Sequence, residues 1–395
     1  MSDQASKHPL AGLRVLDMAR VLAGPWIGQT LSDLGADVIK VESASGDDTR
    51  KWGPPWVEGA EGENLDAAYF HAANRGKRSI IVDFRTEDGQ EIIRRLAAKA
   101  DVVVENFKLG GLAKYGLDHA ALSEINPRLI TCSVTGFGQD GPYAPRAGYD
   151  YIIQGMSGIM DLTGEPDGDP QRIGVAFADI FTGLYGVIAI EAALLHREKT
   201  GRGQHIDMAL LDTMTSVLAN QAQSYLSTGK SPQRTGNYHS AIAPYQSFQC
   251  ADFPIIVTVG NDAQFLRFVT VLGAEAMADD PRYLNNADRV TNRDALTESL
   301  AALCGKIERD TLLQTLEAAG VPAGPINSVA QAFEDPQIKH RGIAVDLPHT
   351  GVKGGTKSYV RTPVKFSESE LSLKRGAPRL GEHTDEILRE IDWKN

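Results

Sequence analysis

One carboxylate lies in a stretch whose residue types could carry covalent chemistry. The apolar run 174–178 is consistent with a short buried strand, and Asp179 follows it directly. From Asp179 to about residue 199, apolar residues recur with helical spacing, so a helix is expected to begin at this carboxylate. Asp is a preferred N-cap because its oxygens accept hydrogen bonds from free backbone N–H groups. The same carboxylate could instead be a nucleophile that forms a covalent intermediate, kept ionised by the helix N-terminus.

Basic residues gather near the ends of predicted strands, where they could bind an anionic ligand or form solvated turns. A parallel sheet brings the carboxyl ends of its strands to one edge, where open α/β sheets bind their ligands. Asn106 and Phe107 lie at such an end, and Tyr149 follows another. The cations concerned are Arg75, Lys77, Arg78, Arg85, Lys108, Lys114 and Arg146.

The composition excludes several classes of function. The chain has 395 residues and a net charge of −11, which argues against nonspecific binding to nucleic acid or to an anionic membrane. Its three cysteines are far apart and offer no metal-ligand spacing, which favours a reducing, cytoplasmic location and no metal. No signal peptide or transmembrane run is predicted.

The order of elements predicts an α/β fold. A strand over 13–18, a helix opened by Pro25 and a strand over 36–42 begin a parallel sheet, and further strands are expected at 80–84, 101–105 and 128–134. Helices are expected at 87–99, 179–199 and 208–226. The first turn offers only Gly24 and Gly28 in place of GxGxxG, which weakens a nicotinamide-binding interpretation.

The length of the chain predicts more than one domain. A polar linker begins near residue 228, and the texture then changes to short strands and helices, so a smaller α+β domain is expected over 228–325. Residues 1–227 would form the first part of a large domain. Residues 326–395 would return to it and complete it.

Taken together, several motifs resemble those of the class III CoA-transferases, the family of formyl-CoA transferase and carnitine CoA-transferase. The resemblance runs nearly from end to end and is carried by the following segments: 10–42, with Ala23-Gly24-Pro25 and Leu34-Gly35-Ala36-Asp37; 74–79; 100–107; 141–150; 174–183; 200–204; 322–325; and 380–384.

The resemblance implies that Asp179 is the nucleophile of an acyl-CoA:carboxylate CoA-transferase. It also implies a Rossmann-like large domain, an interlocked homodimer, and CoA as a substrate rather than a permanent cofactor. CoA would contact the following positions: Leu22 and Ala23, Val82 and Arg85, Asn106 and Phe107, Lys114, Arg146 and Tyr149.

Departures from the family pattern bear on the substrates. Ser43 and Lys114 stand where other members often have Arg, and the glycine-rich loop of formyl-CoA transferase is absent near Asn261. Formate or oxalate chemistry is therefore disfavoured, and succinyl-CoA with a small dicarboxylate is expected. The second carboxylate of such an acceptor needs a cation. The candidates are Arg50, Arg172 and the basic turn 75–78.

Other functions stay open at this point. An α-methylacyl-CoA racemase of the same superfamily would have His where Tyr149 stands, and Tyr is a poor base near neutral pH. A nicotinamide oxidoreductase and a CoA-binding regulator without turnover are more distant alternatives.

Overall fold

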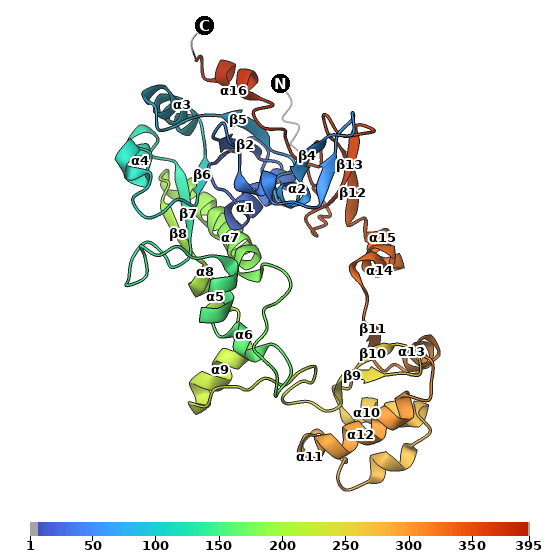
Figure 1. Cartoon of the computed structure of the whole chain (residues 1–395). Coiled ribbons are helices and arrows are strands. Elements are labelled where there is room, and N and C mark those ends of the chain that lie inside the picture. Colours follow the sequence, from blue (N-terminus) through green and yellow to red (C-terminus); the bar gives the residue numbers. More distant parts are fainter. Residues whose placement is uncertain (1–6, 394–395) are drawn as a thin grey trace. The chain divides into compact units, whose positions relative to one another are not determined.

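The computed structural model describes residues 7–393, which form two compact units (Figure 1). The first unit takes in residues up to 159, residues 172–230 and residues from 339 onward. The second takes in residues 160–171 and 231–338. The sequence placed the smaller domain at 228–325 and did not assign the separate segment 160–171 to it.

Among the described residues, the first unit is built on a sheet of six parallel strands in the order β5–β2–β1–β6–β7–β8. Three adjacent valines in β6 illustrate why these segments form buried strands, since β-branched side chains pack well on a pleated surface covered on both faces. The strands are β1 (Arg14–Asp17), β2 (Asp37–Glu42), β5 (Arg78–Ile81), β6 (Val102–Glu105), β7 (Ile130–Thr135) and β8 (His205–Ala209). The predicted α/β class is therefore confirmed.

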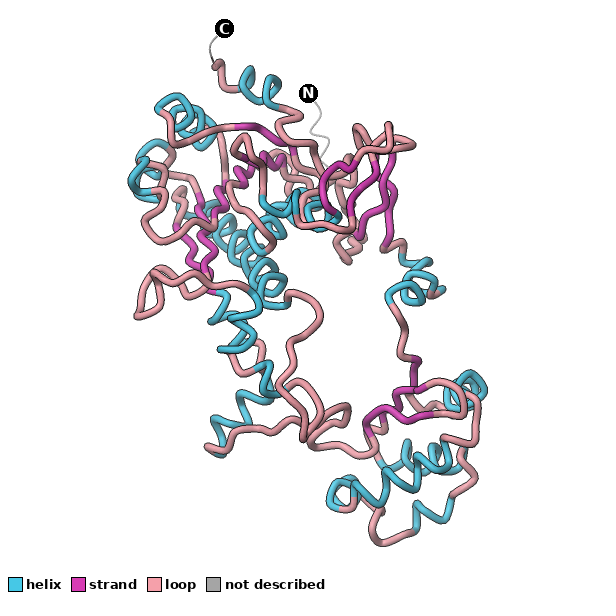
Figure 2. Tube along the Cα trace, in the orientation of Figure 1, coloured by secondary structure: helices cyan, strands magenta, loops and turns pink. Residues whose placement is uncertain are grey.

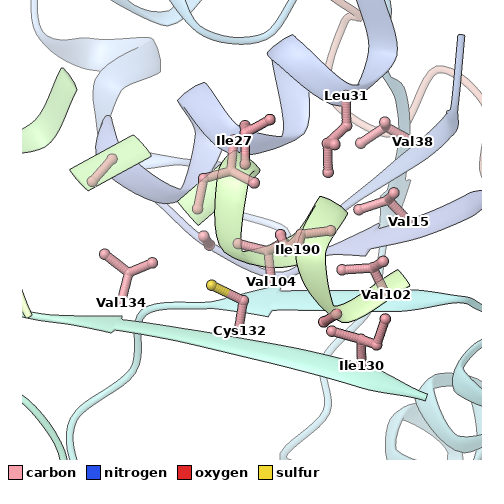
Figure 3. Packing of buried hydrophobic residues seen from close by; sticks show 14 of the residues in the cluster. Val15, Ile27, Leu31, Val38, Val102, Val104, Ile130, Cys132, Val134 and Ile190 are labelled. Atoms are coloured by element: carbon pink, nitrogen blue, oxygen red, sulfur yellow. The ribbon is translucent and has the colours of Figure 1, made fainter. Parts of the chain in front are cut away.

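Helices cover both faces of this sheet. On one face, α1 (Ala23–Asp33) and α7 (Phe177–Thr200) pack together with α5 (Asp150–Met156) and α8 (Leu210–Ser216). Figure 3 shows Ile27 and Leu31 of α1 and Ile190 of α7 meeting Val102, Val104 and Cys132 of the sheet. On the other face lie α3 (Glu87–Ala98), α4 (His119–Ile125) and α16 (Thr384–Glu390).

The C-terminal residues complete this first unit. Helix α16 lies against β5, at the edge of the sheet (Figure 1). The guanidinium of Arg78 on β5 forms ion pairs with Glu386 and Glu390 of the tail and with Asp37 of β2. The backbone N–H of His383 donates to the carbonyl oxygen of Ser79 at 2.9 Å. The edge strand is thus paired with the far end of the chain.

The remaining elements of the first unit are short (Figure 2). They are η1 (Asp48–Lys51), β3 (Trp56–Glu58), β4 (Asn64–Ala67), α2 (Ala68–Ala72), η2 (Ala113–Tyr115), α9 (Ala219–Thr228), β12 (Ala344–Pro348) and β13 (Thr356–Val360), with α15 (Pro336–Arg341) and α6 (Ile159–Leu162) at the junctions between the units.

The second unit has its own apolar core. Its antiparallel sheet has the order β11–β10–β9, and its helices bury Phe265, Phe268 and Leu300 against that sheet. Its elements are β9 (Tyr245–Gln249), β10 (Pro254–Thr258), α10 (Asp262–Val271), η3 (Glu275–Asp279), α11 (Asn286–Thr291), α12 (Arg293–Cys304), α13 (Arg309–Ala318), β11 (Ala323–Pro325) and α14 (Val329–Glu334).

Two local predictions were wrong. The run 174–178 is not a strand, because residues 174–176 form a loop and residues 177–178 already belong to α7, and Val175 in the loop is 55% exposed. The helix predicted at 208–226 is divided into β8, α8 and α9, with Ala219 at φ 47°.

Helix α7 is long and apolar enough to meet a length-and-composition test for a membrane span, although none was predicted. A core helix of a soluble protein passes the same test. Here α7 packs on α1 and on the sheet through Ala178, Val187 and Ile190.

We expect the close packing of α7 on α1 to depend on glycine at position 186. A Cβ atom there would lie 2.5 Å from Cδ1 and 3.0 Å from Cγ1 of Ile27, which is fully buried. Gly186→Val should therefore force the helices apart and lower the free energy of unfolding by about 1–3 kcal/mol. Thermal and denaturant unfolding measure this. Ala98→Val, at an exposed position at the end of α3, should change stability by about 0.5 kcal/mol or less; equal losses in both variants would contradict the packing argument.

Candidate active site

A cleft of about 490 Å³ opens at the carboxyl ends of the parallel strands. It lies where the strand order reverses, with β1 between β2 and β6, which is the place where open α/β sheets bind ligands. Segments 20–23, 106–109 and 144–149 line it together with Asp179. A second cleft of about 500 Å³, lined by residues 348–383, does not include this carboxylate.

Asp179 occupies the first turn of α7, two residues after the helix begins, so it is not the N-cap. Its side chain is partly buried, and the backbone N–H of Ala23, the first residue of α1, donates a hydrogen bond to it. The N-terminal ends of two helices therefore meet at one carboxylate. Both helix dipoles favour negative charge at this point.

Despite these favourable contacts, the pKa of Asp179 is raised to about 7. Burial is the largest cause, and the negative charge of Asp150 is the second, while the hydrogen bond from Ala23 lowers the pKa. Near neutral pH a large fraction of this carboxylate is ionised yet weakly solvated. Strongly shifted pKa values of this kind are typical of catalytic groups.

Asp150 and Gln154 hold the segment that carries the carboxylate. Oδ1 of Asp150 accepts a hydrogen bond from the N–H of Ala178 at 2.8 Å, so a residue of α5 caps α7 from outside the helix. The fully buried Gln154 side chain accepts from the N–H of Ile173 at 2.9 Å and donates to Asp150 at 2.8 Å. The sequence analysis did not predict these roles, since only the fold brings residues 150 and 178 together.

The turn between β1 and α1 has an unusual backbone conformation. Val21 has φ 72°, the left-handed region that a β-branched residue rarely adopts. The side chain of Asn106 clamps the preceding residue, accepting from the N–H of Arg20 at 2.9 Å and donating to its carbonyl oxygen at 2.7 Å. The N–H of Val21 donates to both oxygens of Asp47 at 3.3 Å. Ala23 follows this turn directly.

The structure places most of the residues predicted to contact CoA around this cleft. Val82 is the exception, because its side chain is buried in the core on the other face of the sheet. Arg20 also lines the cleft and was not predicted. The predicted residues in the lining are Leu22, Ala23, Arg85, Asn106, Phe107, Lys114, Arg146 and Tyr149.

The cations of the cleft are exposed, whereas those of the basic turn 75–78 are buried. Arg85 pairs with Asp83 on the surface, and the guanidinium carbon of Arg146 lies 4.5 Å from the centre of the Tyr143 ring. The amide of Asn106 is already engaged with Arg20, so it shapes the cleft more than it offers free donors.

Of the candidates for binding an acceptor carboxylate, only Arg172 is exposed. Arg50 is buried against Glu42 and Asp66. The basic turn 75–78 is neither a solvated surface nor an anion site, because each of its cations is buried against a carboxylate: Arg75 with Asp33, Lys77 with Asp17 and Arg78 with Asp37. Arg172 is exposed, with its guanidinium 5.9 Å from the ring centre of Tyr151.

Within residues 7–393, no group of three or more His, Cys, Asp or Glu side chains is arranged to hold a metal ion. The three cysteines are buried and unpaired.

Comparisons with known proteins agree with this arrangement. The family model described as CoA-transferase family III matches residues 10–384. The chain belongs to this family. It is 55% identical to the succinate–glutarate CoA-transferase of Agrobacterium fabrum over 98% of this chain and 96% of that protein. It is 41% identical to the succinyl-CoA:glutarate CoA-transferase of Homo sapiens over 99% of this chain and 87% of that one.

A solved structure shows the same fold. The CaiB/BaiF family protein of Brucella suis superposes with a TM-score of 0.89 at 60% identity, covering 98% of this chain and 100% of that one. The predicted family and enzyme class are therefore confirmed: the chain is a family III CoA-transferase, and acyl-CoA and carboxylates are the substrates of this class.

We expect the pH dependence of this CoA-transferase to report the charge of Asp150. A carboxylate must be ionised to act as a nucleophile, so a nucleophilic role of Asp179 predicts that kcat/KM rises with pH through about 7. Asp150→Asn removes the negative charge that raises the pKa of Asp179 but keeps an oxygen for the N–H of Ala178. The rising limb should therefore move to lower pH.

The measurement is kcat/KM against pH for both enzymes. Glu198→Gln removes an exposed carboxylate at the other end of α7 and should leave the limb where it is. A limb that does not move in Asp150→Asn would show that Asp150 does not set this pKa.

Proposed function

We propose that this CoA-transferase moves CoA from succinyl-CoA to a small dicarboxylate such as glutarate, through acylation of Asp179. The observation that carries the proposal is this carboxylate with a pKa of about 7, located in a cleft at the N-termini of α1 and α7. The succinyl donor and the glutarate acceptor are supported by the names of the Agrobacterium fabrum, Mus musculus and Homo sapiens relatives.

The proposed reaction divides one difficult exchange into several similar steps. An oxygen of Asp179 attacks the thioester carbon, and the CoA thiolate leaves, giving a mixed anhydride. The thiolate then attacks the carbonyl carbon of Asp179 and releases succinate, giving an aspartyl-CoA thioester. The acceptor carboxylate attacks the carbonyl carbon of this thioester and displaces the CoA thiolate, giving a second mixed anhydride. The thiolate then attacks the acceptor carbonyl of that anhydride, which forms the acceptor's CoA thioester and regenerates the Asp179 carboxylate.

Each attack forms a tetrahedral oxyanion that needs hydrogen-bond donors. The first N–H groups of a helix have no partner within it, and those of Ala23 and Gly24 begin α1 beside Asp179. Loss of one such donor costs about 10²–10³ in rate in other acyl-transfer enzymes. Phe177 and Ile180 are partly buried and would limit water near the anhydride, whereas the exposed Val175 would not.

The phosphates of CoA are proposed to meet the cations of the cleft. Arginine forks and lysine ammonium groups both suit phosphate oxygens. The side chains available in the cleft lining are Arg20, Arg85, Lys108, Lys114 and Arg146.

A homodimer is part of the proposal. Helix α7 exposes apolar side chains that are unusual on the surface of a monomer, namely Leu184, Tyr185, Ile188 and Leu195, with exposed fractions of 41–67%. A second copy of this chain would cover them. The buried free cysteines support a cytoplasmic location.

A racemase finds less support. Tyr149, at the position where the racemases have His, lines the cleft with 60% of its surface exposed, and a tyrosine hydroxyl is a poor general base near neutral pH. The turn after β1 lacks the glycine fingerprint of nicotinamide enzymes, as the sequence indicated.

Acylation of Asp179 can be tested directly. The enzyme is incubated with succinyl-CoA without an acceptor, treated with hydroxylamine and digested for mass spectrometry. We expect a hydroxamate on the peptide that contains residue 179, because both proposed intermediates carry an activated carbonyl there. Asp179→Ala should lower kcat at least about 10³-fold, as loss of a nucleophile does. A label on another residue, or retained activity in Asp179→Ala, would refute the proposed nucleophile.

The acceptor site can be tested through Arg172. The loop that carries this residue is held by Gln154 and leads into the first turn of α7. The exposed guanidinium of Arg172 is proposed to bind the distal carboxylate of an acceptor. Arg172→Gln should raise KM for glutarate about 10–100-fold, the value of a charged hydrogen bond, and leave KM for a monocarboxylate unchanged. Arg202→Gln, an exposed arginine beyond the other end of α7, is the control. Equal effects on both acceptors would argue against this role.

A further inference from the structure

The turn from Arg20 to Ala23 lies on a cluster of buried charges. Two lysines with fully buried side chains bind the backbone on either side of this turn. Nζ of Lys40 donates to the carbonyl oxygen of Ala19 at 3.0 Å, and Nζ of Lys77 donates to that of Pro25 at 2.8 Å. One hydrogen bond thus precedes the turn, and the other lies in the first turn of α1.

Each lysine is neutralised by a carboxylate that also contacts this segment. Lys40 pairs with Asp47 at 2.9 Å, and Asp47 accepts from the N–H of Val21. Lys77 pairs with Asp17 at 2.7 Å, and Asp17 accepts from the N–H of Ala19 at 3.1 Å. Glu42 and Arg50 form the third buried pair, and Glu42 accepts from the N–H of Asp47 at 3.0 Å. We call these six residues the buried ion-pair cluster.

Stability alone does not explain a cluster of this kind. Apolar side chains of similar volume often stabilise a fold as well as a buried ion pair or better, because the ions must be removed from water. Charges with directed hydrogen bonds, however, can hold one backbone conformation against its alternatives. The segment they contact contains Val21 at φ 72°, a conformation that its own side chain disfavours.

We propose that Lys40 and Asp47 are positioning residues, which hold Val21 in its left-handed conformation and thereby aim the Ala23 N–H at Asp179. Asp47 accepts hydrogen bonds from Nζ of Lys40 and from the N–H of Val21, and Ala23, two residues after Val21, donates its N–H to the carboxylate of Asp179. This inference rests on the proposed role of Asp179, since the Ala23 N–H affects catalysis only if the reacting oxygen lies there.

Asp47→Asn removes the charge that binds Lys40 and weakens the acceptor for Val21. We expect kcat to fall about 10²-fold, as small displacements of catalytic groups do, with a much smaller change in KM for succinyl-CoA. Val21→Gly supplies a residue that adopts positive φ freely. In the double variant Asp47→Asn/Val21→Gly, kcat should recover about tenfold relative to Asp47→Asn alone, because a glycine no longer needs the clamp.

The matched control breaks another buried ion pair of the same unit. Arg197, near the end of α7, pairs with Asp101 at 3.0 Å. Asp101 directly precedes β6, so this pair lies at the amino ends of the parallel strands, away from the cleft. Arg197→Met should lower the thermal midpoint comparably to Asp47→Asn and leave kcat within twofold. If Asp47→Asn does not fold, Thr49→Val takes its place, because it removes only the hydroxyl that donates to Asp47 at 2.8 Å; a fall in kcat of about fivefold, restored by Val21→Gly, is then expected.

The outcomes separate this inference from the proposed function. If Asp179→Ala is inactive while Asp47→Asn keeps its kcat, the positioning role is wrong and the nucleophile stands. If Asp47→Asn loses activity and Val21→Gly restores none of it, the cluster does not act through Val21. If Asp179→Ala remains active, the proposed nucleophile fails, and the positioning role fails with it.

Discussion

A partly buried carboxylate that is nevertheless partly ionised near neutral pH is the central constraint on this structure. Removing Asp179 from water and placing it near Asp150 both disfavour its charge, and together they raise its pKa to about 7. The N–H of Ala23 and the dipoles of α1 and α7 oppose these effects without adding a mobile cation. A lysine or arginine in contact would stabilise the carboxylate further, but it would also make it a weaker nucleophile. Backbone dipoles provide a milder compensation, which suits the proposed chemistry.

The sheet topology explains how these parts come together. Parallel strands end at one edge, so residues from the turns after β1, β6 and β7 meet there although they are distant in sequence. Dinucleotide-binding proteins with this strand order use glycines in the turn after β1, where the backbone must approach a ligand closely. Here a valine adopts the left-handed conformation, and hydrogen bonds from Asn106 and Asp47 accompany it. The crevice is thus formed here by a turn that hydrogen bonds hold in place, where dinucleotide-binding proteins have a turn of glycines.

The sequence predicted the general architecture better than the details. The parallel strands β1, β2, β5, β6 and β7 follow from clear apolar runs. β8 was missed because it has only five residues and runs directly into α8, so that its last residues merge into a helical pattern. The break between α8 and α9 has no Pro or Gly to mark it, since Ala219 takes the positive φ. The role of Asp179 came from family resemblance, whereas spacing alone left its role open.

The basic turn shows what local sequence cannot reveal. Arg75, Lys77 and Arg78 resemble an exposed anion site, but their partners Asp33, Asp17 and Asp37 lie 41–60 residues earlier in the chain. Only the fold shows that these charges neutralise one another inside the protein. The hydrogen bond from the Ala178 N–H to Asp150, which holds the start of α7 beside Asp179, was not predicted for the same reason. The two residues that it joins are 28 positions apart in the sequence.

The pairing of β5 with the last helix bears on how this protein is made. Arg78 lies on an edge strand, and its partners Glu386 and Glu390 are more than 300 residues further along the chain. During synthesis on the ribosome, this strand therefore emerges long before the residues that cover it. The first unit can therefore be completed only after nearly the whole polypeptide has been translated, and a chain truncated before residue 384 would leave the β5 edge of the sheet uncovered.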